Sequence, residues 1–271
     1  MPELPEVETT RRGITPYILD SVVERVAIRQ PKLRWPVPEE IVEKLPGQPL
    51  QKLERRGKYL LFHFKTGTLI IHLGMSGSLR ILDSEVQAQK HDHFDLVFTQ
   101  GVCLRLRDPR RFGAVLWTTE PITSHPLLRE LGPEPLGDTF TGVYLHQRGH
   151  QRRIAIKNLI MDSKVVVGVG NIYANEALFR AGIHPTRPCN RISRQRYEQL
   201  AVQITEVLKQ AIEQGGTTLR DFRQEDGRPG YFAQELRVYG KPHAPCPNCG
   251  NPIRHKTIGQ RSSFYCPQCQ H

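Results

Sequence analysis

The sequence predicts an α+β protein with a strand-rich first half, a helical second half and a metal-binding tail. Residues 22–118 alternate apolar and polar side chains with the period of strands, whereas residues 151–214 repeat them at helical spacing. The tail is marked by four cysteines, Cys246, Cys249, Cys266 and Cys269. A chain of 271 residues is long enough for one or two domains and a sizeable core.

The strand-rich half contains two recognisable hairpins. Residues 59–73 form two apolar runs joined by a Thr-Gly turn, and residues 93–107 form two more around a Gln-Gly turn. We therefore expect a sandwich or barrel of antiparallel strands, with a short helix over residues 5–12 covering one face. Cys103 stands alone in one of these strands and is interpreted as a small buried hydrophobic residue.

The helical half follows a segment rich in proline and glycine, residues 121–150, which we interpret as a linker. Apolar spacing predicts helices over residues 152–162, 171–183 and 193–214, the last of them capped by Ser193. We assign the apolar stripe of this last helix to the core. It comprises Tyr197, Leu200, Ala201, Ile204, Val207, Leu208, Ala211 and Ile212.

The composition indicates a polyanionic partner. The chain carries 38 Lys and Arg against 27 Asp and Glu, a formal charge of +11, and its isoelectric point is near 9.6. Nucleic acid is the first candidate, although ribosomal proteins, membrane-surface proteins and ordinary basic enzymes share such a charge. The charge is uneven, because Glu3, Glu6 and Glu8 precede any cation while residues 236–271 contain cations and no acid.

Other classes of protein are disfavoured. Hydrophobic residues make up 38%, the mean hydropathy is −0.46, and there is no run of about 18 apolar residues for a membrane-spanning helix. Apolar residues recur without low-complexity tracts, which argues against disorder. The start, MPELPEVETT, lacks the pattern of a signal peptide, so we expect a cytoplasmic protein.

The terminal cysteines form two Cys-x-x-Cys pairs, CPNC and CPQC. Four thiolates complete a tetrahedral shell and leave no open position, so the pairs predict a structural rather than a catalytic zinc ion. Two disulfides are the alternative, which requires an oxidising compartment. Arg261 falls between the pairs at a predicted hairpin tip, where it is either a phosphate clamp or a solvated side chain.

The first residues bring an amine next to carboxylates. Removal of Met1 exposes the secondary amine of Pro2, whose pKa we expect nearer the α-amino value of about 7.7–8.0 than the lysine value of about 10.4. Such an amine can attack a sugar C1′ and form an iminium ion that acidifies the adjacent C2′–H. The simpler interpretation is an ordinary Met-Pro start, with Glu6 and Glu8 at the positive end of a helix dipole.

Six segments occur together and in one order. They are MPELPEVETTRRG, RRGKYLLF, HLGMSGSLR, DPRRFG, GVGNIYANEALFRAGIHP and the CPNC–CPQC ribbon. Taken together they resemble the bacterial formamidopyrimidine-DNA glycosylases, which are bifunctional 8-oxoguanine glycosylase/lyases. The likeness extends over essentially all 271 residues.

The resemblance implies a fold with DNA in a basic cleft between two domains. Residues 1–130 would form an N-terminal β-sandwich with covering helices, and residues 131–150 an interdomain linker. Residues 151–240 would form a helical domain with a helix-two-turn-helix motif and a lesion-capping loop. Residues 241–271 would form a four-cysteine β-hairpin zinc finger that holds one structural Zn²⁺.

The resemblance also assigns the chemistry. Pro2 would attack C1′ of the damaged nucleotide, Glu3 would act as the acid/base group, and Glu6 would lie near the extruded base. Lys58 would hold the phosphate beside the lesion and support the lyase step. Arg261 would clamp a phosphate from the zinc finger.

An enzyme that acts at C1′ within a duplex must extrude the nucleotide. Met75, Arg110 and Phe112 would fill the resulting gap, and residues 217–231 would form a lid over the lesion. Further residues would bind phosphates or support the lesion pocket. They are His72, Lys157, Asn171 and Tyr239 for DNA, with Glu176 behind the pocket.

The implied reaction is excision of 8-oxoguanine or a formamidopyrimidine from double-stranded DNA, followed by β- and δ-elimination. We expect a monomer that needs no organic cofactor, binds no membrane and associates with the bacterial nucleoid through DNA. One alternative is an endonuclease VIII-like glycosylase for oxidised pyrimidines, which shares Pro2 and Glu3. A non-enzymatic zinc-ribbon DNA-binding protein is the alternative from a different class.

Overall fold

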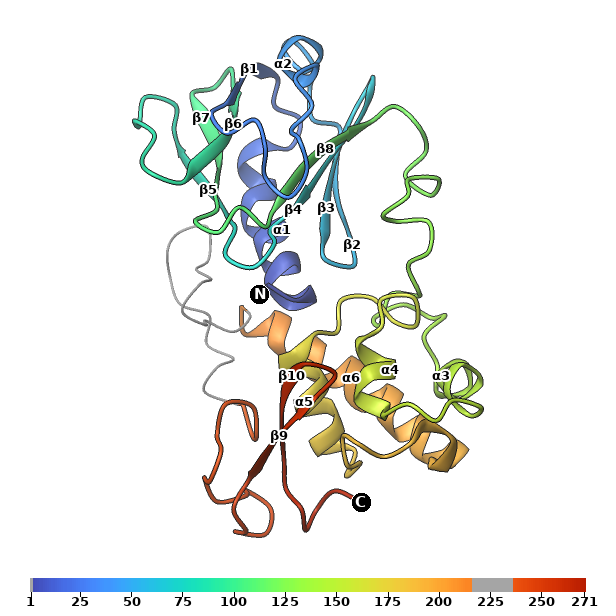
Figure 1. Cartoon of the computed structure of the whole chain (residues 1–271). Coiled ribbons are helices and arrows are strands. Elements are labelled where there is room, and N and C mark those ends of the chain that lie inside the picture. The colour runs from blue at the N-terminus through green and yellow to red at the C-terminus, as the bar shows by residue number, and fades with distance from the viewer. Residues whose placement is uncertain (1, 216–235) are drawn as a thin grey trace. The chain divides into compact units, whose positions relative to one another are not determined.

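The computed structural model describes residues 2–215 and 236–271, so the predicted lid over residues 217–231 lies outside the described residues (Figure 1). The described chain divides into two compact units, with residues 2–129 in the first and residues 130–213 and 236–271 in the second. Within the described part, none of the helices is long and apolar enough to cross a membrane.

The first unit consists of two antiparallel four-stranded sheets, with strand orders β1-β6-β7-β5 and β2-β3-β4-β8. The strands of the first sheet are β1 (Val23–Ile28), β5 (Ser78–Asp83), β6 (Asp92–Phe98) and β7 (Val102–Arg107). Those of the second are β2 (Lys52–Arg56), β3 (Tyr59–Phe64), β4 (Gly67–His72) and β8 (Ala114–Thr118). The predicted antiparallel sandwich is therefore confirmed.

Both sheets and the first helix share one apolar core. Buried side chains of β3 and β4, such as Phe62 and Ile71, belong to the same cluster as Phe94 and Leu106 of β6 and β7. Burial of this apolar surface is the main favourable term for the unit. A second helix, α2 (Ile41–Lys44), packs against β1 and was not predicted.

Helix α1 (Leu4–Ile18) is longer than the predicted helix over residues 5–12. Gly13 and Pro16 are both unfavourable in the interior of a helix. Ile14 and Ile18 nevertheless continue the buried stripe of this helix into the core. Tertiary packing therefore outweighs local propensity at this end.

The two predicted hairpins are present, with one shift at a turn. Phe64 pairs with Gly67, so the β3–β4 turn consists of Lys65 and Thr66 instead of Thr66 and Gly67. The β6–β7 connection runs through Gly101, whose φ of +80° favours glycine.

The second unit consists of four α-helices, one short 3-10 helix and a two-stranded hairpin in its described residues. These elements are α3 (Gly142–Gly149), α4 (Ile156–Met161), α5 (Asn171–Arg180), η1 (Cys189–Arg191), α6 (Arg194–Glu213), β9 (Arg254–Ile258) and β10 (Arg261–Tyr265). We call β9, β10 and their turn the zinc hairpin. In the described part, α5 contacts α4, α6 and β10, and so joins the helices to the hairpin.

The helix predictions hold for α5 and α6 and, in shortened form, for α4, which covers Ile156–Met161 of the predicted residues 152–162, whereas α3 was not predicted. All eight residues of the predicted stripe on α6 are buried, and Ser193 Oγ accepts a hydrogen bond from Arg196 N at 3.4 Å. Helix α3 lies inside the segment predicted as a linker. It forms because Thr141 caps its start and Leu145 is buried in a helix that packs on α6.

Candidate functional site

The chain begins with three functional candidates in one buried turn. Pro2 is buried, and Glu3 and Glu6 are each 2% exposed. Glu3 occupies the N-cap of α1, and its backbone N–H donates to Oε2 of Glu6 at 2.8 Å. Glu3 and Glu6 thus form a capping box at the helix start, which fixes the backbone directly after Pro2.

A carboxylate network ties this helix to the neighbouring hairpin. Glu8 Oε1 accepts from Arg11 and Arg12, both at 2.8 Å, and Glu8 Oε2 accepts from Arg55 at 3.1 Å. Arg55 also donates to the carbonyl of Gly57 at 2.9 Å. Burial alone would raise the pKa of Glu8, but hydrogen bonds from Arg11 and Arg12 and the charges of Arg11 and Arg55 lower it to about 2.

Lys58 lies at the tip of the β2–β3 hairpin. Arg56 pairs with Tyr59, which leaves Gly57 and Lys58 as a two-residue turn. Gly57 has a φ of +57°, which suits glycine at the first position of a type II′ turn. The start of α1 and this turn lie at the same end of the first unit (Figure 1).

His72 ends β4 beside this turn. Its ring stacks at a tilt on Tyr59, with centroids 4.8 Å apart, and its Nδ1 accepts from Gly74 N at 3.0 Å. Burial, together with the charges of Lys58 and Arg34, lowers the pKa of His72 to about 4. The imidazole is therefore neutral at pH 7, with its proton on Nε2 available as a donor.

Two adjacent loops carry Met75, Arg110 and Phe112. We call residues 73–77 and 108–113 the paired loops. A Cβ on Gly74 would lie 2.3 Å from the carbonyl carbon of Phe112, so only glycine permits the loops to touch there.

Asp108, which is fully buried, holds these loops together. Its Oδ1 accepts from Ser76 Oγ at 2.7 Å, and its Oδ2 accepts from Gly113 N at 2.7 Å. Arg110 N donates to Ser76 Oγ at 3.2 Å. The sequence analysis did not single out Asp108, although it stands in the DPRRFG segment.

Two of the predicted side chains on these loops, Arg110 and Phe112, are exposed, whereas Met75 is half-buried. Phe112 is 46% exposed, and the Arg110 guanidinium lies 4.9 Å from the centre of its ring. A cation held over an exposed aromatic ring is a ready platform for a base. The sequence analysis did not single out Arg34 either. Its backbone N–H donates to Gly113 O at 3.0 Å, and its charge helps to lower the pKa of His72.

The four cysteines of the tail converge in the second unit. Their sulfur atoms lie within 4.8 Å of one another, with Cys246 and Cys269 at 3.9 Å and Cys249 and Cys266 at 3.5 Å. A tetrahedral Zn²⁺ with bonds of about 2.3 Å requires sulfur separations of this size. The cluster therefore fits one structural Zn²⁺ with all four ligands supplied by the chain.

Arg261 begins β10, directly after the turn of the zinc hairpin. Ile258 pairs with Arg261, so the turn consists of Gly259 and Gln260, with φ of +54° and +61°. Positive φ at both positions is typical of a type I′ turn. Arg261 itself is exposed.

Helix α5 carries two of the predicted residues, Asn171 and Glu176. Asn171 opens the helix, and its Nδ2 donates to Ser262 O at 3.0 Å. Glu176 is fully buried, and its carboxylate accepts from the backbone N–H groups of Arg237 at 2.9 Å, Val238 at 3.0 Å and Tyr239 at 2.8 Å. Glu176 therefore holds the turn that carries Tyr239 against α5.

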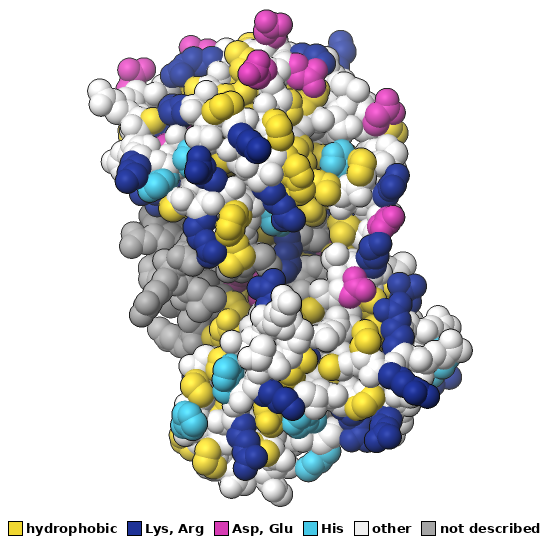
Figure 2. Space-filling view, in the orientation of Figure 1, with side chains coloured by type: hydrophobic (Ala, Val, Ile, Leu, Met, Phe, Trp, Pro, Cys, Tyr) yellow, Lys and Arg dark blue, Asp and Glu magenta, His cyan; other side chains and the backbone are white. Residues whose placement is uncertain are grey.

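Lys157, which the resemblance assigns to DNA binding, is a buried residue of α4. Its side chain is fully buried, and Nζ donates to Ser262 O at 2.9 Å and to Ser263 Oγ at 2.6 Å. In this arrangement the ammonium contacts the zinc hairpin. Cations predominate on the visible face of this unit, where acidic side chains are scarce (Figure 2).

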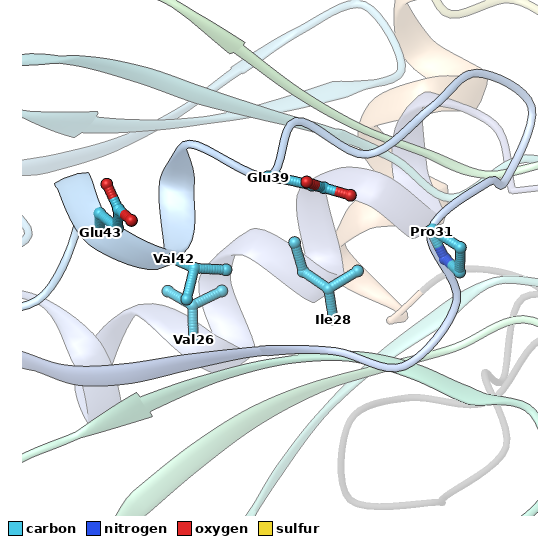
Figure 3. Close-up of a pocket in the computed structure, with 6 residues that line it drawn as sticks. All are labelled: Val26, Ile28, Pro31, Glu39, Val42 and Glu43. Atoms are coloured by element: carbon cyan, nitrogen blue, oxygen red, sulfur yellow. The ribbon is translucent and has the colours of Figure 1, made fainter.

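A groove in the first unit has the opposite character. Val26, Ile28 and Val42 form its apolar floor, and Glu39 and Glu43 line it from α2 and the segment before it (Figure 3). Carboxylates repel phosphate, so this groove lies outside the candidate DNA-binding surface.

Comparisons with known proteins agree along the whole chain. The profile of the formamidopyrimidine-DNA glycosylase N-terminal domain matches residues 1–115, and that of the formamidopyrimidine-DNA glycosylase H2TH domain matches residues 131–223. A zinc finger found in FPG and IleRS matches residues 245–271.

Individual relatives match over their full length. The chain is 60% identical to a formamidopyrimidine-DNA glycosylase of Methylococcus capsulatus and 57% identical to one of Syntrophotalea carbinolica, covering 100% of each chain in both cases. The structure resembles MutM (Fpg) of Thermus thermophilus with a TM-score of 0.89 at 37% identity, covering 99% of this chain and 98% of that one. It resembles Lactococcus lactis Fpg in complex with DNA containing N7-benzyl-Fapy-dG with a TM-score of 0.92 at 32% identity, covering 100% of both.

Proposed function

Since the chain belongs to the formamidopyrimidine-DNA glycosylase family, we propose a role for each residue of its site. The protein is a DNA glycosylase/lyase of base excision repair, with damaged DNA as its partner and one structural Zn²⁺. The observation that carries the proposal is the buried Pro2–Glu3 start, in the unit that also presents Lys58, Met75, Arg110 and Phe112.

The proposed nucleophile is the amine of Pro2 after removal of Met1. Its nitrogen forms a bond to C1′ while the bond from C1′ to the damaged purine breaks, and the base leaves with the bonding electrons and takes up a proton. The attached nitrogen then loses its proton, and its lone pair expels O4′ from C1′, which opens the sugar ring as O4′ takes up a proton. The iminium ion formed in this way withdraws electrons from C2′. Loss of the C2′ proton expels the 3′ phosphate, and a second elimination expels the 5′ phosphate.

Glu3 is proposed as the proton carrier for these steps. It directly follows Pro2, so one carboxyl group can serve both the amine and the opening sugar. Glu6 accepts from the Glu3 backbone N–H, and in this proposal it keeps the Glu3 backbone in place beside the extruded base.

Phosphate binding is proposed for Lys58 and His72 in the first unit and for Asn171, Tyr239 and Arg261 in the second. A neutral His72 can donate from Nε2, and its low pKa keeps that role constant across neutral pH. Lys58 and Arg261 supply the charges that release counterions from DNA.

The gap left by the extruded nucleotide is proposed to be filled from the paired loops. Phe112 is already exposed, so it exchanges water for base surface when it enters the stack. Met75 adds a flexible apolar side chain, and Arg110 can donate to the orphaned cytosine. We further propose that the protein acts as a monomer without an organic cofactor, on DNA in the bacterial nucleoid.

Borohydride trapping on a duplex with 8-oxoguanine opposite cytosine tests this function. The wild-type chain should form a covalent adduct, and Pro2→Gly with its zinc retained should form at least about a hundredfold less. Equal trapping by Pro2→Gly would remove Pro2 as nucleophile, and no wild-type adduct would indicate a non-enzymatic zinc-ribbon DNA binder. Faster excision of thymine glycol than of 8-oxoguanine would assign the chain to the endonuclease VIII type.

A further inference from the structure

The outer edge of the zinc hairpin is held by one buried amide. Asn175 of α5 is 1% exposed, and its Oδ1 accepts from the backbone N–H of Phe264 on β10 at 2.7 Å. Its Nδ2 donates to the carbonyl of Asn171, one helical turn earlier, at 2.6 Å. A single side chain therefore satisfies an edge N–H of the hairpin and connects it to the residue that opens α5.

A buried ammonium holds the same strand from the other helix. Lys157 of α4 is fully buried and donates to the Ser262 carbonyl and the Ser263 hydroxyl. Asn171 donates to that same Ser262 carbonyl. Because an ammonium is costly to bury unless it is hydrogen-bonded, its position depends on the hairpin being docked.

The turn of the hairpin also meets α4 closely. A Cβ on Gly259 would lie 2.6 Å from Oδ1 of Asn158. Arg261 is two residues along the chain from this contact and precedes the carbonyl that Lys157 and Asn171 share. The position of Arg261 is thus determined by contacts on both sides of it.

We propose that Asn175 and Lys157 are positioning residues that latch the zinc hairpin onto α5 and α4, and so set the places of Asn171 and Arg261 for phosphate binding. This inference rests on the proposed DNA-binding roles of Asn171 and Arg261. Neither latch residue touches DNA in this scheme, since both are buried. Their effect passes through the hairpin, so it should be felt in DNA affinity more than in the chemical step at Pro2.

The first test compares Asn175→Ser with the wild type on a duplex that carries a tetrahydrofuran abasic analogue. We expect roughly ten- to thirtyfold weaker binding, because the Phe264 N–H loses its partner. Zinc content should remain at the wild-type level, and borohydride trapping at saturating enzyme should stay within about threefold. Asn190→Ala, an exposed asparagine on η1, is the matched control and should bind as the wild type does.

A double-mutant cycle separates latching from a general loss of stability. If Asn175 acts through Arg261, adding Asn175→Ser to Arg261→Ala should weaken binding by no more than about threefold beyond Arg261→Ala alone. Full additivity of the two losses would overturn the proposal, as would wild-type affinity of Asn175→Ser. A wild-type protein that binds no abasic duplex would instead refute the proposed function.

Asn175→Asp provides a readout that holds even if the serine variant folds poorly. A protonated Asp restores both hydrogen bonds, since its hydroxyl can donate to Asn171 O and its carbonyl can accept from Phe264 N. An ionised Asp places an oxygen against the Asn171 carbonyl. At a position that is only 1% exposed, burial should raise the pKa of the Asp carboxyl well above its ordinary value of about 3.9. DNA affinity relative to wild type should therefore recover as the pH falls from about 8 to about 5.5, and an affinity ratio that does not change with pH would contradict the latch.

Discussion

The N-terminal edge of the first unit and the zinc hairpin of the second are stabilised by different chemistry. Buried carboxylates organise the first: Glu8 joins α1 to the hairpin of Lys58 through Arg55, and Asp108 holds the paired loops together. Four thiolates, a buried amide and a buried ammonium organise the second. The covalent chemistry proposed at Pro2 and the DNA binding proposed for the zinc hairpin can therefore be disrupted separately.

Loss of zinc should give the largest effect. Structural zinc contributes about 10–16 kcal/mol to folding in small zinc domains, and here Cys246 and Cys266 also belong to the apolar cluster of Phe179, Val238 and Ile253. Cys249→Ala should release the ion, misplace Arg261 and weaken binding to an abasic duplex by about a hundredfold or more. Zinc content and DNA affinity measured on the same sample test this.

The thiol control for zinc loss is Cys103→Ala. Cys103 is buried in β7 of the first unit and is distant in sequence from the metal cluster. Burial raises the pKa of its thiol to about 11, so the thiol is protonated. This variant should keep its zinc and its DNA affinity. If Cys249→Ala lacks zinc and still binds DNA with wild-type affinity, DNA binding does not depend on the zinc hairpin.

Disruption of Asp108 should give the next largest effect, confined to the first region. Asp108→Asn replaces an acceptor by a donor opposite the Ser76 hydroxyl or the Gly113 N–H, at a cost of about 2 kcal/mol in unfolding free energy. Excision of 8-oxoguanine should slow by about tenfold or more, because the two loops no longer hold their side chains in position to fill the gap left by the extruded nucleotide. Ser76→Ala removes one partner only and should give a smaller loss; excision at the wild-type rate in both variants would exclude this role.

The parts of the site that could be predicted from sequence are those set by local spacing. The cysteine pairs, the stripe on α6 and the hairpin that presents Lys58 each depend on residues close in the chain. The parts that could not be predicted depend on distant partners. The family resemblance assigned Lys157 to DNA binding, whereas its burial depends on the docked hairpin, which lies about a hundred residues away in the chain. Asp108 and Asn175 carry no signal of their own, because their hydrogen bonds cross between loops or elements.

Glu8 gives the smallest effect and the most direct test of the difference between the regions. Its folded pKa of about 2 lies below its ordinary value of 4.5, so the ionised form stabilises the fold above about pH 4.5, and this contribution is lost as the pH falls toward 2. Glu8→Gln should lower the unfolding free energy by about 1–2 kcal/mol at neutral pH, after allowance for solvent screening. It should also slow trapping modestly by loosening the hairpin of Lys58.

Urea unfolding of wild type and Glu8→Gln at pH 7 and about pH 3 separates this effect from the zinc region. Acid also protonates the zinc thiolates, but it does so equally in both proteins, so their difference isolates Glu8. That difference should shrink at the lower pH because the wild-type carboxylate loses its advantage there. Glu40→Gln is the control, since Glu40 pairs with Lys44 on an exposed helix and should cost no more than about 0.5 kcal/mol. A difference between wild type and Glu8→Gln that stays constant with pH would mean that packing, and not charge, joins α1 to the hairpin.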